Sequence, residues 1–486
     1  MRISRRIVLG GALAGLARAG WADAPLRSPL PLPRPPLPGV VAAADALVAA
    51  ARLGGAVSYV VADAQSGRVL AARDGARAMP PASTAKLLTS LYALDRLGPG
   101  YRFTTRLIAT GPLRGGRLAG DLVLAGGGDA TLHTDQLVQL AKALRGAGVT
   151  SVAGRFLVWG GALPFAVQIA ADQPVHAGYN PAVGGLNLNF NRVYFEWKPD
   201  GGGYALTMDA RSDSIAPRVQ SARIALADRQ APLFTYAQRS GHEEWTVAQS
   251  ALGQGGSRWL PVRRPDSYAG DVFRTLARAQ GIALPPPEAV AHPPGGSVLA
   301  EHRSAPLTDM LRDMLRHSTN VTAEAVGMGA SIAAGRVPDG IAASGRAMGD
   351  WLGSQGVPGV RCIDHSGLGV DTHVSAESMV AVLAGLAPHA GLRGLLRPFG
   401  LPQVGGKANP LKVVAKTGTL NFVSTLAGYV ATPAGADLAF AIFAADLARR
   451  AAAGPVEAPP GGRAWLGRAR TLQQQLIAGW GRTLAG

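Results

Sequence analysis

The stretch from Met79 to Ser90, MPPASTAKLLTS, decides how the rest of the chain is interpreted. Two prolines precede a serine and a run of good helix formers, which predicts a helix from Ser83 to Leu97. Ser83 and Lys86 are three residues apart, so this helix places both side chains on one face. The chain has 42 arginines and only six lysines, which makes a lysine here unusual. Arginine keeps its proton, whereas a buried lysine can become neutral and act as a base. A plain solvated lysine is the alternative.

Two further short motifs fall on predicted elements of other kinds. Ser318-Thr319-Asn320 is the only S-x-N and lies in a loop between two predicted helices. Lys416-Thr417-Gly418 is the only K-T-G and ends an apolar strand, where a glycine lets a substrate approach the strand edge. Each motif alone is weak, and chance is the alternative explanation of each. Their order, on a helix start, a loop and a strand, favours a common function.

This ordered set resembles the signature of penicillin-binding proteins and class A β-lactamases. The 235 residues between Ser83 and Ser318 exceed what one helical domain needs. The chain resembles the class C low-molecular-mass penicillin-binding proteins, the D-alanyl-D-alanine carboxypeptidase/endopeptidase (DacB) family, over about residues 40–450. Besides the serine-lysine motif, the resemblance includes GDLVLAGGGDATL (120–132), GGLNLNFNRV (184–193), HSTNVTAE (317–324), DHSGLG (364–369) and AKTGTLNFVSTLAGYV (415–430). The chain departs from the family at Thr319, where Asp is frequent, and in a short segment, 400–412.

The resemblance implies a role for each motif. Ser83 attacks the carbonyl between two D-alanines of a peptidoglycan stem peptide and forms an acyl-enzyme, and Lys86 is the base. Ser318 relays a proton to the leaving D-alanine, and Asn320 binds the substrate amide. β-Lactams mimic the substrate and acylate the same serine. No metal or organic cofactor is expected.

The K-T-G strand is implied to bind the substrate. Lys416 supplies positive potential, and Thr417 and Thr419 hold the terminal carboxylate beside Gly418. The backbone N–H groups of Ser83 and Thr419 form an oxyanion hole.

The predicted fold class is α/β (α+β), a transpeptidase domain like that of penicillin-binding proteins and serine β-lactamases. A hairpin (57–62 and 68–72) and three late strands (411–419, 425–432 and 438–444) form an antiparallel five-stranded sheet flanked by helices. A strand-rich region with Gly turns is inserted between them, and 186–190 and 193–197 are predicted as its strands. The expected parts are a signal peptide (1–24), a Pro-rich linker (25–39), a catalytic part (40–99), an insertion (100–261) and a second catalytic part (262–486).

The N-terminus resembles an export signal. Arg5 and Arg6 precede a short apolar run, and Ala22-Asp23-Ala24 supplies a small-x-small cleavage site. The arginine pair resembles the twin-arginine class, with an ordinary secretory signal as the alternative. We therefore expect a periplasmic protein that is cleaved near Ala24 and has no integral membrane span.

A final helix (464–484) with an apolar face is expected to pack on the sheet, the alternative being a membrane surface.

Composition limits the partners and the chemistry. The net charge of +17 and pI near 10.8 favour anionic partners such as peptidoglycan, and no motif indicates nucleic-acid binding. Cys362 is the only cysteine, so neither a disulfide within the chain nor a cysteine metal cluster is expected.

The alternatives for function are a penicillin-binding or cell-wall-binding protein without turnover, and a serine β-lactamase or esterase of the same fold. The oligomeric state is not predicted.

Overall fold

The structure is a computed structural model that describes residues 38–484. Its largest sheet has the strand order β19-β20-β21-β22-β1-β2, and all neighbours pair antiparallel. The strands are β1 (Ala56–Asp63), β2 (Val69–Arg73), β19 (Arg397–Pro398), β20 (Lys412–Leu420), β21 (Val423–Ala431) and β22 (Asp437–Ala445). The predicted five-stranded antiparallel sheet is confirmed, and the two-residue β19 adds a sixth strand at its edge.

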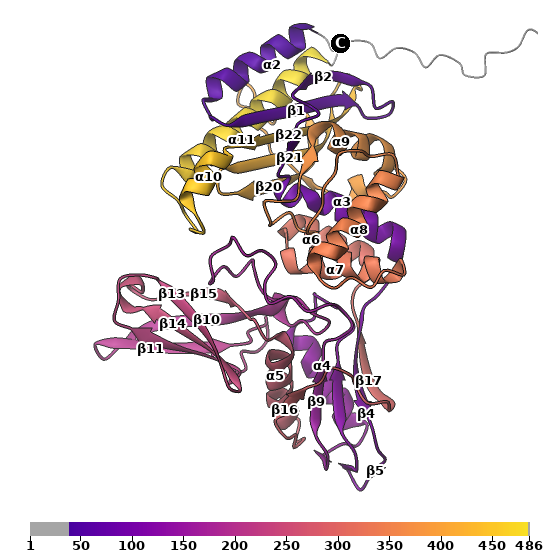
Figure 1. Ribbon diagram of the computed structural model, residues 1–486, viewed down its shortest axis with the longest axis vertical. Helices are drawn as coiled ribbons and strands as arrows, with labels where there is room; N and C mark the ends of the chain where they lie inside the picture. Colours follow the sequence, from indigo (N-terminus) through magenta and orange to yellow (C-terminus); the bar gives the residue numbers. More distant parts are fainter. Residues whose placement is uncertain (1–37, 485–486) are drawn as a thin grey trace, which may run out of the picture. The chain divides into compact units, whose positions relative to one another are not determined.

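Helices cover both faces of this sheet (Figure 1). In β1, Tyr59 and Val61 face a core shared with α2 (Pro38–Ala51) and α11 (Gly462–Thr483). Val60 and Ala62, on the opposite face, join a second core with another group of helices. These helices are α3 (Ala85–Leu97), α6 (Leu307–His317), α7 (Asn320–Ala333), α8 (Ile341–Ser354) and α9 (Ala376–Ala381), which continues into a π-helical turn, η4 (Val382–Leu386). Alternation along the strands thus separates the two helical layers.

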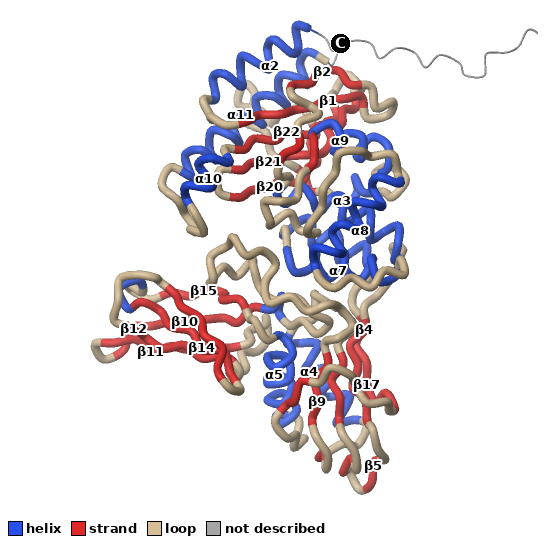
Figure 2. Tube along the Cα trace, in the orientation of Figure 1, coloured by secondary structure: helices blue, strands red, loops and turns tan. Residues whose placement is uncertain are grey.

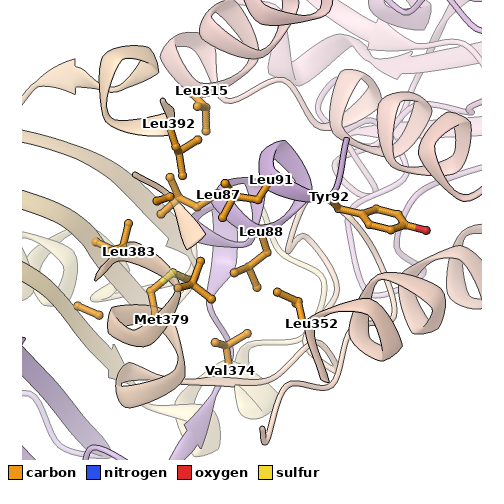
Figure 3. Close-up of a cluster of buried hydrophobic side chains, with 14 of the residues drawn as sticks. Leu87, Leu88, Leu91, Tyr92, Leu315, Leu352, Val374, Met379, Leu383 and Leu392 are labelled. Carbon is orange, nitrogen blue, oxygen red and sulfur yellow. The ribbon is translucent and has the colours of Figure 1, made fainter. Parts of the chain in front are cut away.

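Helix α3 runs through the second core. Figure 3 shows Leu87, Leu88 and Leu91 of α3 among side chains from later helices and loops, including Leu352 and Leu392. Because apolar groups surround α3 on several sides, all of its first nine residues are buried. Such burial fixes the helix, and with it the start of the helix where Ser83 and Lys86 stand.

The final helix packs on the sheet, as the sequence predicts. Trp465 and Trp480 of α11 are fully buried, and Trp465 donates a hydrogen bond to the Leu53 carbonyl at 2.7 Å. A short helix, α10 (Leu447–Ala453), precedes it. Among residues 38–484, no helix combines the length and the apolar character that a membrane span requires.

The middle of the chain forms separate sheets around a core of its own (Figure 2). One sheet has the order β16-β9-β7-β4-β17, and helices α4 (Thr134–Gly146) and α5 (Pro265–Ala279) share its core. Its strands are β4 (Thr104–Ala109), β7 (Leu122–Ala125), β9 (Phe156–Trp159), β16 (Pro287–Ala289) and β17 (Ser297–Arg303).

Two three-stranded sheets share that core. Their orders are β11-β10-β15 and β12-β14-β13. Their strands are β10 (Arg192–Asp200), β11 (Gly203–Asp209), β12 (Ala222–Ala227), β13 (Phe234–Arg239), β14 (His242–Ala248) and β15 (Gly256–Pro261). The shortest strands are β3 (Ala78–Met79) paired with β18 (Val374–Ser375), and β5 (Leu113–Arg114), β6 (Arg117–Leu118) and β8 (Ser151–Val152) in one small sheet. The short helical turns are η1 (Ala82–Thr84), η2 (Asn189–Asn191), η3 (Gln249–Ala251) and η5 (Leu392–Leu395).

One expectation for the middle region is wrong in detail. Residues 186–190 are not a strand; they lead into η2, where Asn189, Phe190 and Asn191 all have left-handed φ angles. Buried asparagine amides hydrogen-bond this turn, for example Asn191 Nδ2 to the Ala182 carbonyl at 2.8 Å, and alternation of apolar and polar residues cannot reveal such pairing. Helix α4 was not anticipated.

Helix α5 falls in the range 262–486, which the sequence assigned to the second catalytic part, but it packs with the middle region. Its Phe273 lies in the core of the middle region, and β17 pairs with β4 up to Arg303. Helical periodicity shows that a helix forms but not which core receives its apolar face. The two ends of the middle region meet: Phe103 N–H donates to Ser304 Oγ at 3.0 Å, and Ser304 N–H donates to the Phe103 carbonyl at 2.9 Å. The predicted signal peptide, 1–24, lies outside the described residues, as does most of the linker.

Candidate active site

Ser83 stands in a 3-10 turn that leads directly into α3. The turn η1 covers Ala82–Thr84, and α3 begins at Ala85. Ala82 has a left-handed φ of 45°, an unfavourable conformation for a residue with a Cβ. Such conformations persist where surrounding structure holds them and cluster at functional sites. Ser83 is only half-buried, whereas its neighbours on both sides are buried.

Lys86 lies under Ser83 and is fully buried. Its Nζ donates to Ser83 Oγ at 3.0 Å, to Asn320 Oδ1 at 2.7 Å and to the Ser366 carbonyl at 2.8 Å. Burial lowers the pKa of Lys86 to about 7, although nearby Glu324 and Asp364 oppose the shift. A lysine with a pKa near 7 is neutral in about half of the molecules at neutral pH. Lys86 therefore has the position and the proton affinity of a base for Ser83.

Two buried carboxylates hold the loop that contacts Lys86. Glu324 of α7 accepts hydrogen bonds from the backbone N–H groups of His365 at 3.0 Å and Ser366 at 2.9 Å. Asp364 accepts from Thr372 Oγ1 at 2.7 Å and from two backbone N–H groups. Burial raises the pKa of both groups, that of Glu324 to about 8. The carboxylates fix the Ser366 carbonyl as an acceptor for Lys86.

Ser318 and Lys416 form the second pair of the site. Lys416 Nζ donates to Ser318 Oγ at 3.0 Å and to the Thr417 carbonyl at 2.6 Å. Lys416 is 3% exposed, and burial, with repulsion from Lys86 and Arg397, lowers its pKa well below the ordinary value. Ser318 ends α6 with a left-handed φ of 60°. This conformation turns the chain between α6 and α7 and brings the Ser318 hydroxyl to Lys416.

The K-T-G segment lies along β20, where β19 pairs only with Val414 and Ala415. Among the described residues, β20 from Lys416 onward therefore has no strand on that side. Gly418 is buried, and a Cβ added to it would collide with Thr425 Oγ1 and lie 2.9 Å from Ser83 N. The sequence explained this glycine by the approach of a substrate. The structure adds a second reason, which is close packing against the turn that carries Ser83. Thr417 is half-buried and Thr419 exposed.

A residue of the middle region also reaches the site. Asn320 starts α7, and its Nδ2 donates to the Tyr179 carbonyl at 2.9 Å, while its Oδ1 accepts from Lys86. The Tyr179 side chain is 43% exposed. The structure thus brings Ser83, Lys86 and Asn320 together directly, and the pair of Lys416 and Ser318 joins them through the neighbouring β20.

Comparison with known protein families identifies the chain. The model of the D-Ala-D-Ala carboxypeptidase 3 (S13) family matches residues 40–458. This chain belongs to that family. It is therefore an enzyme of the serine D-Ala-D-Ala carboxypeptidase group, and the recognition from sequence is confirmed.

Curated relatives span most of the chain. The D-alanyl-D-alanine carboxypeptidase of Actinomadura sp. (strain R39) is 30% identical over 446 residues, 82% of this chain and 79% of the relative. D-alanyl-D-alanine carboxypeptidase DacB of Haemophilus influenzae is 24% identical. The alignment covers 80% of this chain and 85% of DacB. The crystal structure of penicillin binding protein 4 (dacB) from Haemophilus influenzae has a TM-score of 0.72 at 22% identity, covering 89% of this chain and 99% of the solved one. This chain therefore has the fold of that crystal structure.

Sequence reasoning gave no role to three residues beside Lys86. Glu324, Asp364 and Ser366 fall in the segments HSTNVTAE and DHSGLG, which carried the resemblance without a stated function. The structure joins these segments through the hydrogen bonds of Glu324 to the backbone of His365 and Ser366. A signal existed, namely acidic residues inside otherwise apolar or small-residue segments, but nothing in the sequence showed that they meet. Among residues 38–484, no group of three or more His, Cys, Asp or Glu could hold a metal ion.

Proposed function

We propose that the chain is a serine-type D-alanyl-D-alanine carboxypeptidase and endopeptidase that works through an acyl-enzyme on Ser83. The observation that carries the proposal is the fully buried Lys86, whose Nζ lies 3.0 Å from Ser83 Oγ. A lysine whose pKa is lowered to about 7 by burial can take the serine proton at neutral pH. The S13 family membership supplies the substrate class, peptidoglycan stem peptides.

Acylation follows from these contacts. Neutral Lys86 accepts the proton of Ser83 Oγ as the oxygen bonds to the carbonyl carbon of the penultimate D-alanine. The carbonyl oxygen becomes an oxyanion, which the backbone N–H groups of Ser83 and Thr419 would stabilise. The closeness of Gly418 to Ser83 N supports this pairing of N–H groups across the turn.

Release of D-alanine needs a proton at the leaving nitrogen. Ser318, hydrogen-bonded to Lys416, gives its proton to that nitrogen as the C–N bond breaks, and is reprotonated from the neighbouring lysines. Water then attacks the ester, Ser83 regains its proton, and the shortened peptide leaves. No step requires a metal or an organic cofactor.

The open edge of β20 is the proposed place of the substrate's terminal carboxylate. Thr417 and Thr419 offer hydroxyl donors there, and Lys416 offers a positive charge close by. Asn320 would hold the substrate's amide with its Nδ2. A requirement for a free carboxylate distinguishes a carboxypeptidase from an esterase of the same fold.

The setting of the enzyme is also part of the proposal. We assign the chain to the periplasm, exported by the predicted signal at 1–24, with peptidoglycan and β-lactams as its ligands. The strand-rich region is proposed to be an insertion with its ends at Phe103 and Ser304, whose backbones are hydrogen-bonded to each other. The β17–β4 pairing supports an end later than residue 261.

The test combines labelling with turnover. Purified protein is incubated with a peptide ending in D-Ala-D-Ala, and released D-alanine is measured. In parallel a fluorescent penicillin labels the protein, and the labelled peptide is mapped. We expect release of D-alanine and a label on Ser83, with both lost in Ser83→Ala. A label without any release would favour a penicillin-binding protein that does not turn over, and a label retained in Ser83→Ala would refute the nucleophile.

A further inference from the structure

The middle region contains a cavity apart from the serine site. Its volume is about 400 Å³, a size suited to a small ligand. Strands β10 and β15, the start of α4 and the loop after β11 enclose it. We call it the Arg192 pocket; the residues used below are His133, Asp135, Phe190, Arg192, Asp213 and Trp259.

Arg192 enters this pocket without a counterion. Its Nε is buried and lacks a hydrogen-bond partner, and in the described part of the chain its guanidinium forms no ion pair. Burial lowers its pKa, which shows the cost of keeping this charge away from water. Neighbouring Arg211 is different, because it forms ion pairs with Asp209 at 3.0 Å and Glu196 at 3.6 Å. A guanidinium that lines a pocket without a carboxylate partner can bind an anion through charge-assisted hydrogen bonds.

Aromatic rings hold the Arg192 guanidinium in place. Its central carbon lies 5.1 Å from the centre of the Phe190 ring and 5.3 Å from that of Trp259. Trp259 in turn contacts Tyr194 edge to face at 5.1 Å. Contact with aromatic rings orients a guanidinium, and its N–H groups can still donate hydrogen bonds to a ligand. Trp259 is half-buried, so part of its ring is accessible to a ligand in the pocket.

Neither acidic residue of the pocket forms an ion pair with Arg192. The Asp135 carboxylate accepts hydrogen bonds from Ser212 Oγ at 2.9 Å and Ser214 Oγ at 2.7 Å. Asp213 is exposed at the rim and can accept from a hydroxyl or an amide N–H. A ligand that combines a carboxylate with N–H or hydroxyl donors therefore matches the pocket.

We propose that the Arg192 pocket binds a carboxylate-bearing glycopeptide fragment of peptidoglycan, outside the serine site. Its carboxylate pairs with Arg192, its sugar or peptide covers Trp259, and its donors face Asp213. The substrate class rests on the proposed function, but the pocket requires no reaction at Ser83. Phe190, on one wall, also packs against the core that includes Val321 and Ala325 of α7, the helix that begins at Asn320. A bound strand would thus be anchored on an element adjoining the reaction site.

The experiment measures binding in the full chain after penicillin has acylated Ser83. The probe is N-acetylmuramoyl-L-alanyl-D-isoglutamine, which has a carboxylate and lacks D-Ala-D-Ala, and calorimetry reports its affinity. We expect saturable binding that weakens about tenfold or more in Arg192→Gln. Arg223→Gln is the matched control, an exposed arginine on β12 of the same region, and should bind like the wild type.

A second probe keeps the test independent of the variant's folding. The carboxamide form of the same glycopeptide should bind the unaltered chain about tenfold more weakly, because it cannot form the charged pair with Arg192. Equal affinity of the two probes, equal affinity of Arg192→Gln and wild type, or no saturable binding by wild type would each overturn the proposal. Release of D-alanine, measured separately on unacylated protein, reports the proposed function, so failure of one claim is distinguishable from failure of the other.

Discussion

At the scale of single residues, the site depends on two lysines kept out of water. Lys86 and Lys416 are both nearly inaccessible, and burial is the largest cause of the lowered pKa of each. Two adjacent buried cations would repel each other, so the pair favours a state in which one proton is absent. Arginine would hold its proton in either place, which gives a physical reason for lysine in a chain that otherwise prefers arginine.

The first prediction concerns Lys86→Arg. Arginine retains charge and reach but cannot accept the Ser83 proton, so acylation by fluorescent penicillin should fall by about 10²–10⁴ or more. Lys142→Arg is the control, since Lys142 is an exposed lysine on α4, and its acylation rate should match the wild type. Near-normal acylation of Lys86→Arg would mean that another group is the base.

The second prediction concerns pH. Because the base is the neutral form and the pKa of Lys86 is about 7, the base form is lost as pH falls through that value. The second-order acylation rate should therefore rise from acidic to neutral pH, with an inflection near 7, and level off above it. Stopped-flow measurement with a chromogenic cephalosporin gives the profile. A rate that stays constant across this range would contradict a lysine base of lowered pKa.

The third prediction separates stability from catalysis at Ser318. Its left-handed φ of 60° costs roughly 1–2 kcal/mol for a residue with a Cβ, and glycine avoids that cost. Ser318→Gly should thus keep or raise the thermal midpoint while release of D-alanine falls, because the hydroxyl bonded to Lys416 is gone. Ser354→Gly, a change in the last turn of α8 away from the site, serves as the control for activity. Unchanged release of D-alanine in Ser318→Gly would remove Ser318 from the mechanism.

At the scale of elements, three segments meet around one turn. The turn η1 touches β20 through Gly418 and the 364–369 loop through Gly367, since an added Cβ on Gly367 would collide with the Ala82 carbonyl. Gly367 also has a left-handed φ of 71°. Neither contact leaves room for a methyl group, so the register between helix, strand and loop is set by backbone-to-backbone packing.

The fourth prediction tests that packing with Gly418→Ala. The new methyl group would collide with Thr425 Oγ1 and press on Ser83 N and the Pro81 carbonyl, each 2.9 Å away. We expect penicillin acylation to drop at least about tenfold even where the protein remains folded. In Gly400→Ala the added Cβ meets nothing within 4 Å, so this variant should acylate normally. Equal acylation rates in the two variants would show that β20 can move away without harm.

At the scale of the whole molecule, the middle region touches the site without supplying any of the three motifs. The Tyr179 carbonyl accepts from Asn320, and Ile169 and Val183 pack in one cluster with Val321 and Ala325 of α7. Ion pairs add to the contact, including Arg450 with Asp172 at 2.8 Å. The region is therefore expected to shape access and to steady α7, while the chemistry stays with the large sheet and its helices.

The fifth prediction removes residues 104–303 and joins Phe103 to Ser304 by a short Gly/Ser linker. The two residues are already hydrogen-bonded to each other, so the linker spans little distance. The variant, once soluble and cooperatively folded, should still be labelled by penicillin on Ser83, with reduced activity on crosslinked peptidoglycan. The deletion exposes the apolar side chains of Val321, Ala325 and Met328 to solvent, so the variant must first be shown to be soluble. A folded variant with no label at all would show that the middle region builds the site.

The sequence by itself determined the large sheet, the helices that cover it and the three motifs. The near-continuous apolar runs of β21 and β22, helical periodicity and the S-x-x-K spacing are local properties, so each can be recognised without knowing what packs nearby. The contact of Ser83 with Lys86 follows from local helical geometry alone, since the 3-10 turn η1 runs directly into α3 and residues three apart share a face.

Only the tertiary structure decided which distant groups meet. Burial lowers the pKa of Lys86, and burial arises from segments hundreds of residues away, as the bonds to Asn320 and Ser366 illustrate. The left-handed turn at Asn189–Asn191 depends on buried asparagine amides, and the assignment of α5 to the middle core depends on the partner its apolar face finds. Desolvation, side-chain hydrogen bonds across the fold and the choice between two cores are non-local quantities, and short-range sequence patterns carry no record of them.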